Sequence, residues 1–350
     1  MTHFDAIVVG TGVAAASTAI RLRSLGWRVA IVERRETLPC CYESISGFAV
    51  QELSSLSINI GFPISKVSAW WGGECEHHAY YPQARIVERA PLIGSLRNLA
   101  AKRGVESFAF DSRFELTRAD ERWRVTAQYV QPRCQRTLCA PYIVDATGRA
   151  SIVGKKLGSR RISFDNLSSV SFAVRNPSAV GIWTETTHDG WWNACSEPGG
   201  GTISFFCAPN TVREAFGNIS RYFEQAQHVN RICSHPGVPS FARNCNSSAL
   251  VPCAGPGWMA VGDAAWSAQP VASAGISKAL RDARLATEVL QGHFAQYERL
   301  QSAEFNSYRC QLKQHYCLEQ RWINSPFWQA VRTRETSVDL EEKRAKRHNV

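Results

Sequence analysis

The chain has 350 residues, of which 44% are hydrophobic and 20% charged, the composition of an ordinary globular protein with one large or two smaller domains. No apolar run approaches the roughly 20 residues of a membrane span, and no nucleic-acid module accompanies the net charge of +10, which a solvated basic tail or an acidic partner would explain. The 12 cysteines lack paired metal-ligand spacing and no signal peptide is evident, so we expect reduced thiols, no metal and a cytoplasmic protein.

The first thirty residues predict a strand, a tight turn and a helix that together bind a dinucleotide. The apolar run 5–9 is typical of a strand buried in a parallel sheet, and it leads into a G-x-G-x-x-A turn and a helical pattern. Gly10 permits the turn, Gly12 lets the backbone approach a pyrophosphate, and Ala15 lets helix and strand pack closely. Free N–H groups at the helix N-terminus favour phosphate, and an acid ending the second strand favours ribose. The predicted dinucleotide contacts are Gly10, Gly12, Val13, Ala14, Ala15, Glu33 and Arg34.

The remainder of the chain alternates between helical and strand periodicity. Helical patterns recur at residues 85–104, 211–229, 276–291 and 294–322. Strand-like runs occur at 105–109, 114–117, 123–129, 140–144, 168–207 and 258–261. This order predicts an α/β chain with a doubly wound domain, an antiparallel-sheet substrate domain and a C-terminal helical segment. The predicted boundaries are 1–57, 86–165 and 250–292 for the doubly wound domain, 58–85 and 166–249 for the substrate domain, 293–335 for the helical segment, and 336–350 for a flexible basic tail.

Further motifs stand at strand ends and helix starts. Asp263, in a Gly-Asp-Ala-Ala stretch after an apolar strand, can hold a polyol hydroxyl. Gly275 opens a helix whose N-terminus can stabilise negative charge on a reduced ring system. Asp-Ala-Thr-Gly-Arg at 145–149 ends another strand, and Glu43-Ser44 follows the first strand–helix–strand unit. The chemistry of Asp263 and Gly275 predicts a second set of cofactor contacts beyond the glycine turn.

Together with that turn, these motifs resemble those of flavin-dependent aromatic hydroxylases and tryptophan-halogenase-like flavoproteins. The resemblance implies a glutathione-reductase-type, Rossmann-like domain that binds FAD. It also implies flavin contacts at Glu43, Ser44, Arg89, Asp145, Gly148, Gly262, Asp263, Pro270, Gly275 and Ile276. Two positions depart from the pattern: Tyr42 replaces a glycine before Glu-Ser, and Gln269 replaces an aspartate before proline.

Tryptophan-rich stretches narrow the resemblance. Gly-Trp-Trp at 190–192, Glu-x-Arg-Trp at 319–322 and Pro-Phe-Trp at 326–328 are similar to elements of flavoproteins that mature tryptophylquinone-containing amine oxidases. That resemblance implies an FAD-dependent monooxygenase that uses reduced flavin and O₂, through a C4a-hydroperoxide, to hydroxylate a tryptophan side chain of a peptide or partner protein. It also implies electrons from NAD(P)H, taken directly or through a separate flavin reductase. The candidate catalytic residues are Glu43, Ser44, Lys66, Trp191 and Trp192.

Two other functions stay open at this stage. One is halogenation or hydroxylation of a free small aromatic, although the W-x-W-x-I-P element of tryptophan halogenases is absent and Lys66 is the sole candidate for their essential lysine. The other is a flavin-binding maturation or escort protein without turnover. Structural interpretations compete as well: Trp191-Trp192 as sheet core, Glu43 as a helix cap, and His77, His78 and His188 as structural histidines in place of a proton relay.

Overall fold

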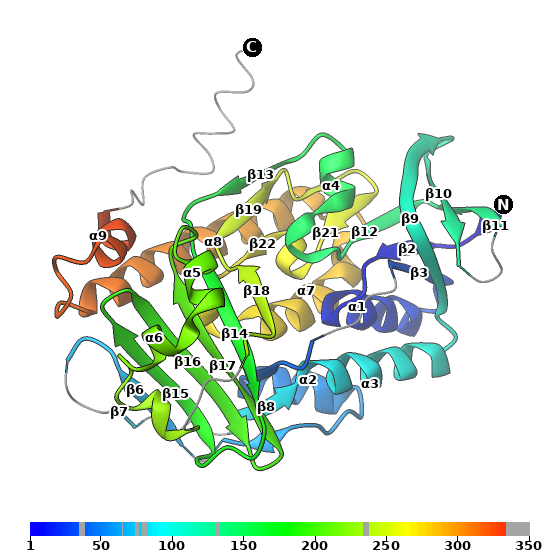
Figure 1. Ribbon diagram of the computed structural model, residues 1–350. Coiled ribbons are helices and arrows are strands. Elements are labelled where there is room, and N and C mark those ends of the chain that lie inside the picture. Colours follow the sequence, from blue (N-terminus) through cyan, green and yellow to red (C-terminus); the bar gives the residue numbers. More distant parts are fainter. Residues whose placement is uncertain are drawn as a thin grey trace.

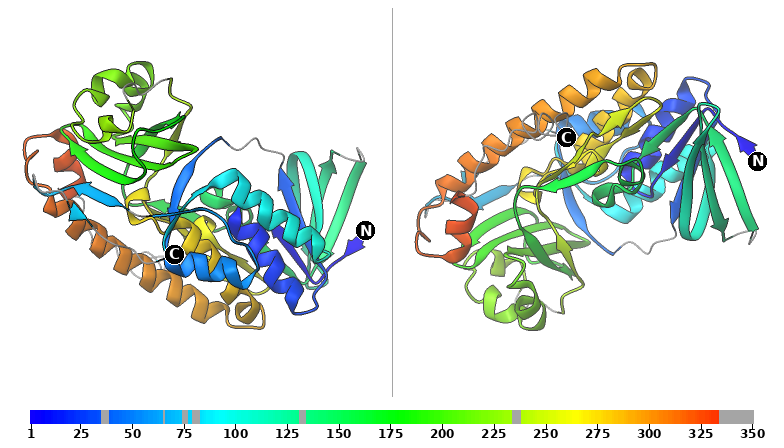
Figure 2. Two further views of the ribbon diagram at one scale, coloured as in Figure 1. Left: turned by 90° about the horizontal axis from the view of Figure 1, so that it is seen from below. Right: turned by 90° about the horizontal axis from the view of Figure 1, so that it is seen from above.

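The computed structural model describes residues 1–34, 39–64, 66–73, 77–78, 83–130, 134–233 and 238–333. They form two lobes, one on a mainly parallel sheet and one on an antiparallel sheet, with the long helix α8 (Phe294–Leu318) running along both (Figures 1 and 2). The predicted tail 336–350 and the side chains of His77 and His78 lie outside the described part. In the described ranges, no helix is both long enough and apolar enough to cross a bilayer.

The first lobe is organised around a nine-stranded sheet with the order β1-β11-β10-β9-β3-β2-β12-β21-β20. The strand bounds are β1 Thr2–His3, β2 Ala6–Val9, β3 Val29–Arg34, β9 Glu106–Ala119, β10 Arg122–Tyr129, β11 Cys134–Ala140, β12 Tyr142–Asp145, β20 Ala254–Gly255 and β21 Trp258–Ala260. Strands β9, β3, β2, β12 and β21 run parallel to their neighbours in that series, whereas β9, β10 and β11 form an antiparallel meander. The predicted α/β class is confirmed.

Helices pack around this sheet and against one another. Their bounds are α1 Val13–Ser24, α2 Gly47–Ser55, α3 Arg89–Lys102, α4 Ile152–Lys156 and α7 Gly275–Val289. Helix α1 contacts both α3 and α7, and it buries Ala15, Ala19 and Leu22 in the shared core. Because alanine side chains are short, α1 can approach its neighbours closely, which fixes the strand–turn–helix unit at the centre of the lobe.

The second lobe is a seven-stranded sheet with the order β18-β14-β17-β16-β15-β6-β7. Its bounds are β6 Val67–Trp70, β7 His77–His78, β14 Ser168–Val174, β15 Gly181–Thr187, β16 Gly190–Glu197, β17 Gly200–Cys207 and β18 Phe241–Asn244. The described pairings are antiparallel except for β15 with β6. One face packs Phe172, Trp192 and Phe205 with the short helices α5 (Val212–Gly217) and α6 (Ile219–Phe223). The opposite face is turned toward the first lobe.

Two three-stranded sheets and a terminal helix complete the described sheets and α-helices. The first sheet has the order β4 (Tyr42–Ile45), β8 (Arg85–Glu88) and β5 (Phe62–Pro63), and the second β13 (Arg160–Ser163), β19 (Ser248–Val251) and β22 (Trp266–Ser267). Helix α9 (Pro326–Thr333) packs against α8. Trp71, Trp191, Tyr316 and Trp328 form a buried aromatic cluster that joins these two helices to the second-lobe sheet.

Several predicted elements differ from the structure. Residues 85–88, predicted as helix, form β8, because Ile86 and Val87 are buried where the strand pairs with β4. The two strands predicted at 105–109 and 114–117 are one strand, β9. The helix predicted over 211–229 is broken at Asn218, whose φ of −145° and ψ of 59° separate α5 from α6. Helix α8 ends at Leu318, because the next residue is extended.

Candidate functional site

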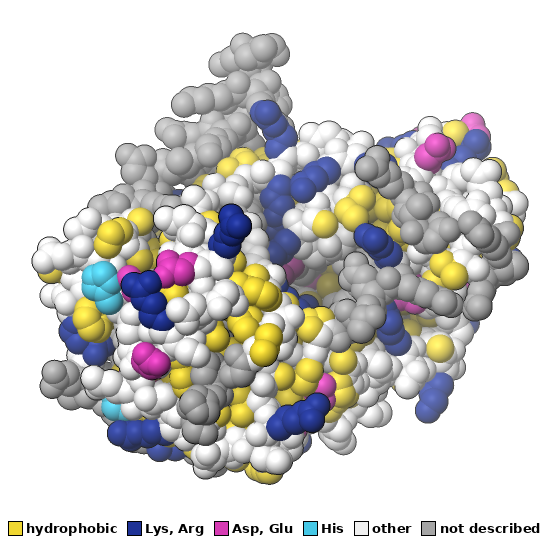
Figure 3. Space-filling view, viewed as in Figure 1, with side chains coloured by type: hydrophobic (Ala, Val, Ile, Leu, Met, Phe, Trp, Pro, Cys, Tyr) yellow, Lys and Arg dark blue, Asp and Glu magenta, His cyan; other side chains and the backbone are white. Residues whose placement is uncertain are grey.

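A cavity of about 1130 Å³ lies between the two lobes. It is lined by the β2–α1 turn, β4, the start of α3, the segment after β12, the loop before α7, and the first-lobe-facing side of the second sheet. Figure 3 shows this face of the molecule hollowed at its middle, with Lys and Arg side chains gathered along the rim. Typical ligand pockets measure roughly 300–1,000 Å³, so this cavity has room for a large cofactor and part of a second molecule.

The β2–α1 turn brings bare backbone to the cavity wall. Gly10 has a φ of +148°, and a Cβ there would lie 2.2 Å from the backbone oxygen of Ala146. Gly12 precedes α1, and a Cβ on it would meet nothing within 4 Å. Both glycines line the cavity, whereas three neighbouring predicted contacts do not: Val13, Ala14 and Ala15. The N-terminus of α1 has no side-chain cap, so its free N–H groups and the open space beside Gly12 suit an anionic group.

The predicted ribose-binding acid is held by an arginine that the sequence analysis did not single out. The carboxylate of Glu33 accepts a hydrogen bond of 2.6 Å from Arg97 of α3, which also donates to the backbone oxygen of Thr11. Glu33 is not among the residues that line the cavity, but Arg34, which follows it, is. Arg97 therefore ties the end of β3 to the glycine turn, and Arg34 adds a cation at this end of the cavity.

Glu43, Ser44 and Arg89 meet at the cavity wall. A guanidinium N–H of Arg89 donates to the Glu43 carboxylate over 2.7 Å, and that carboxylate raises the pKa of Arg89 above its usual value. The Ser44 hydroxyl donates to the hydroxyl of Ser273, over 3.1 Å, from the loop before α7. The structure thus brings together three predicted residues from β4 and α3.

The motif at 145–149 divides between structural and cavity-lining residues. Asp145 is fully buried, and its carboxylate accepts hydrogen bonds from the backbone N–H groups of Thr147 and Gly154. Burial raises the pKa of Asp145, and the same hydrogen bonds act against that rise. Asp145 therefore shapes the turn and does not reach the cavity, whereas Gly148 and Arg149 do.

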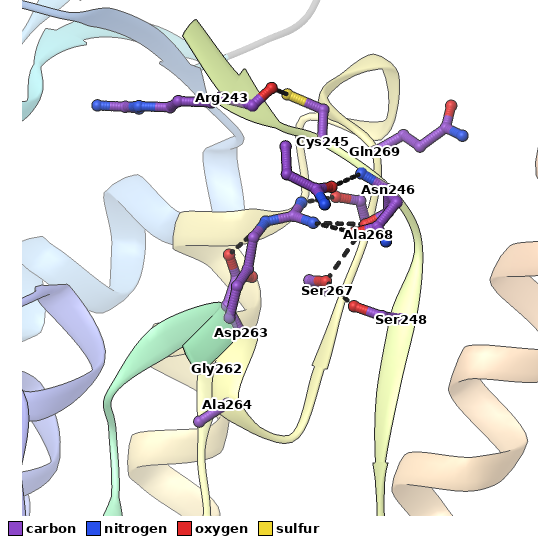
Figure 4. A network of polar contacts seen from close by, with 12 residues as sticks. Arg243, Cys245, Asn246, Ser248, Gly262, Asp263, Ala264, Ser267, Ala268 and Gln269 are labelled. Carbon is purple, nitrogen blue, oxygen red and sulfur yellow. Dashed lines mark hydrogen bonds and ion pairs between the residues drawn. The ribbon is translucent and has the colours of Figure 1, made fainter. Parts of the chain in front are cut away.

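Arg149 connects the segments on which the motif and the predicted flavin contacts lie. Its guanidinium donates to the backbone oxygens of Asn246 and Ala268 and lies 3.7 Å from the Asp263 carboxylate. Figure 4 shows this network with Asn246, Asp263 and Ala268 converging on one guanidinium. This arginine ends the predicted motif at 145–149, but no role was predicted for it.

The loop before α7 and the start of that helix supply the remaining predicted contacts. Those that line the cavity are Asp263, Pro270, Gly275 and Ile276. Gly262 is buried behind them, with its N–H bonded to the Asp282 carboxylate over 2.8 Å. Like α1, helix α7 has no side-chain cap. Two helices with free N–H groups therefore open on the same cavity, an arrangement that fits the pyrophosphate and the reducible ring of FAD.

The second-lobe sheet contributes a row of small polar side chains that the sequence analysis missed. This polar wall consists of Ser169 and Ser171 of β14, Asn193 and Cys195 of β16, and Thr202 and Ser204 of β17. The hydroxyls of Ser171 and Ser204 are 2.7 Å apart and hydrogen-bonded. Phe206, Phe241 and Arg243 also line this side of the cavity. Together they offer hydrogen-bonding groups, aromatic surface and one cation to a second molecule.

Three of the five candidate catalytic residues, Trp191, Trp192 and Lys66, are not among the residues that line the cavity. Trp191 and Trp192 are fully buried. Trp191 stacks on Phe206 with ring centres 3.9 Å apart, and Trp192 lies in the core on the other face of the sheet. Lys66 lies with its Nζ 4.7 Å from the ring centre of Trp183. The two tryptophans are as buried as the rest of the sheet core, and Lys66 is not among the lining residues.

Three thiols line the cavity and are held in their protonated form. Burial, helped by the nearby Glu43 carboxylate, raises the pKa of Cys41 to about 12. Burial likewise raises the pKa of Cys195 to about 12, again with help from Glu43. The pKa of Cys245 is also raised by burial. No ionised thiol nucleophile is therefore available at these three positions near neutral pH.

Comparison with known proteins identifies the family. The model of the tryptophan halogenase family matches residues 77–349. This chain belongs to the tryptophan halogenase family. Its relative LodB of Marinomonas mediterranea, described as an FAD-dependent oxidoreductase, is 26% identical over 363 residues, covering 94% of this chain and 97% of LodB. The halogenase-family chain is accordingly a flavin-dependent oxidoreductase with FAD as its cofactor.

Solved structures of the same fold include enzymes of two kinds. The myxobacterial chondrochloren halogenase CndH has a TM-score of 0.82 and 20% identity, covering 100% of this chain and 89% of CndH. QhpG, a peptidyl tryptophan dihydroxylase of tryptophylquinone cofactor biogenesis, has a TM-score of 0.77 and 21% identity, covering 94% of this chain and 79% of QhpG. At these identities the likeness establishes the fold of the halogenase-family chain and leaves its substrate to be argued from the site.

Proposed function

We propose that the chain hydroxylates an aromatic ring with reduced FAD and O₂, and that its substrate is a tryptophan side chain of a peptide or partner protein. The observation that carries this proposal is the make-up of the second-lobe side of the cavity, where the described residues include hydroxyls and aromatic rings but no lysine. Lys66 packs on Trp183, and Lys156 lines the first-lobe side with its Nζ 5.3 Å from the ring centre of Phe114. The essential lysine that the resemblance associates with tryptophan halogenases therefore has no counterpart among these second-lobe residues.

The relatives support hydroxylation of a peptide in different degrees. QhpG acts on a peptidyl tryptophan, and its fold is shared across nearly the whole of this chain. LodB matches almost end to end and is described as an oxidoreductase. CndH, which is a halogenase, keeps halogenation of a smaller aromatic as the second candidate function.

We propose the following roles for the chain's own residues. The turn at Gly10 and Gly12 and the start of α1 hold the pyrophosphate of FAD, and the start of α7 stabilises negative charge on its ring. Bound and reduced, FAD supplies the activated oxygen that hydroxylates the substrate. The Glu43–Arg89 ion pair positions the cofactor side of the cavity. Phe206 packs against the substrate ring and excludes water, while the polar wall orients it.

We further propose that electrons come from NAD(P)H, directly or through a separate flavin reductase. The glycine turn of β2 and α1 is the one dinucleotide motif in the sequence, and FAD occupies it under this proposal. A nicotinamide cofactor would then bind only transiently, or not at all.

The deciding experiment is turnover of the FAD-loaded protein with a tryptophan-containing peptide, a flavin reductase with NADH, and ¹⁸O₂. The proposal predicts that the peptide gains one or two ¹⁸O atoms at tryptophan, without any halide requirement. Catalase is included so that released hydrogen peroxide cannot oxidise the peptide, and protein without FAD is the matched control. A halogen incorporated from added chloride or bromide would favour the second candidate. Peptide binding without any mass change would favour an escort protein.

A further inference from the structure

Arg243 is the cation that the second lobe presents to the cavity. Among the described residues from that lobe which line the cavity, no other is a lysine or arginine. It lies on the edge strand β18, directly opposite Ser169 of β14 in the sheet register. Figure 4 shows its side chain extended away from the network around Asn246 and Asp263. Arg243 therefore serves a different part of the cavity from Arg149.

The Arg243 guanidinium is held in place but not neutralised. Its central carbon lies 4.2 Å from the ring centre of Phe241, two residues earlier on the same side of β18. Within the described part of the chain, no carboxylate pairs with this guanidinium, whereas Arg89 is paired with Glu43 at 2.7 Å and Arg149 binds Asp263 and two backbone oxygens. The contact with Phe241 fixes the direction of the guanidinium and leaves its N–H donors for a ligand.

The positive charge of Arg243 affects thiols on two sides of the cavity. Burial raises the pKa of both Cys41 and Cys245, and the charge of Arg243 acts against that rise at both thiols. Cys41 lies just before β4, and Cys245 just after β18. The guanidinium therefore faces the interior of the cavity and not the solvent beyond the edge strand.

We propose that Arg243 binds a carboxylate of the substrate, and so selects aromatic substrates that carry an acidic group close to the ring. This inference rests on the proposed function, because it takes the second-lobe side of the cavity as the substrate side. A guanidinium offers two parallel N–H donors that match the two oxygens of a carboxylate. The neighbouring hydroxyls of Ser169 and Ser171 can serve the remaining lone pairs. In a peptide substrate, the carboxylate belongs to an acidic residue beside the tryptophan.

The test compares two ligands that differ only in charge. Indole-3-propionate and indole-3-propionamide are titrated into the oxidised, FAD-loaded protein by calorimetry, without reductant, so that no turnover occurs. Wild-type protein is expected to bind the acid about tenfold to a hundredfold more tightly than the amide, the range expected for a charge-assisted hydrogen-bonded pair. R243Q is expected to lose this preference while binding the amide within about twofold of wild type, and R243K to keep part of it.

The matched control is R175Q, which removes an exposed arginine just after β14 that does not line the cavity, and which should keep the full preference for the acid. The proposal is overturned if wild-type protein binds the acid no better than the amide. It is overturned equally if R243Q weakens both ligands by the same factor, because that result would mean a structural role alone.

Failure of this inference and failure of the proposed function give different results. If the acid is preferred through Arg243 but no tryptophan peptide gains oxygen, the hydroxylation proposal fails and the carboxylate site stands. If peptides gain oxygen at the same rate whether glutamate or glutamine flanks the tryptophan, the hydroxylation proposal stands and the carboxylate site falls.

Discussion

Replacing Gly10 or Gly12 with alanine should have opposite consequences, although the two glycines are two residues apart in one turn. At Gly10, the new methyl group would lie 2.2 Å from the backbone oxygen of Ala146, against 3.4 Å for an ordinary contact, so about 1.2 Å of movement is required. Neither backbone can yield easily. The Gly10 N–H donates to the backbone oxygen of Val32 over 2.9 Å, and the Ala146 N–H donates to that of Val9 over 2.8 Å. We expect G10A to lower the free energy of unfolding by about 2–5 kcal/mol, from overpacking and a φ that disfavours alanine.

G12A is the matched variant, because its methyl group would touch no protein atom within 4 Å and its φ of −93° suits alanine. Alanine lowers the entropy of the unfolded chain, which stabilises the protein, but it is a poorer N-cap than glycine, which destabilises it. Because the two effects nearly cancel, the free energy of unfolding of G12A should stay within about 0.5 kcal/mol of wild type. The methyl group would stand where the pyrophosphate is proposed to lie. Loss of one charge-assisted hydrogen bond there weakens FAD binding about tenfold to a hundredfold.

Urea unfolding of the FAD-free proteins measures the first quantity, and titration with FAD measures the second. Separating them matters, because bound FAD would itself raise the apparent stability. If G12A binds FAD as wild type does, the pyrophosphate does not pass over Gly12. A G10A protein as stable as wild type would show that the close approach of Gly10 to Ala146 does not constrain the fold.

Three further variants test other parts of the molecule. Burial alone would raise the pKa of Glu319, but hydrogen bonds from Arg321 and its other partners lower it to about 2. This lowered pKa therefore contributes about 3 kcal/mol to the free energy of unfolding. That contribution is present above pH 4.5 and is lost as the pH falls from 4.5 toward 2. E319Q should remove this pH dependence from the stability measured by urea unfolding. W191F should cost about 1–3 kcal/mol of stability in the same assay but leave FAD affinity unchanged, and a weakened affinity would place Trp191 in the site after all. K66M should keep the rate of peptide oxygenation, since Lys66 packs its Nζ over Trp183 and is not among the residues that line the cavity, and abolished turnover with folding intact would favour the lysine-dependent alternative.

The parts of the site that the sequence predicted are those encoded over short distances. The glycine turn, Glu43-Ser44 and Gly275 each belong to a local pattern of strand end, turn and helix start, in which neighbouring residues fix one another's position. The α/β class followed from the same local periodicities. These features required no knowledge of which strands pair.

The missed residues depend on pairing between distant strands. Ser171 and Ser204 meet only because β14 and β17 pair in one register, and nothing in either strand's alternation tells which face will line a cavity. Trp191 was a candidate because Gly-Trp-Trp resembles a family element, and its neighbours in the sequence do not reveal that Phe206, Tyr316 and α9 cover it. No sequence motif marked Arg97, because its partner Glu33 lies on a different element, far from it in the sequence.

The protonated thiols around the cavity bear on how this protein survives its own chemistry. Thiolates, not thiols, are the forms that oxidants convert to sulfenic and higher acids. With pKa values of about 12, Cys41 and Cys195 are almost entirely in the thiol form at pH 7. Under the proposed function, oxygen is activated in the cavity that both sulfurs line. Burial, with a smaller contribution from Glu43, keeps those sulfurs in the unreactive form, so the lining that holds the substrate would also resist oxidation.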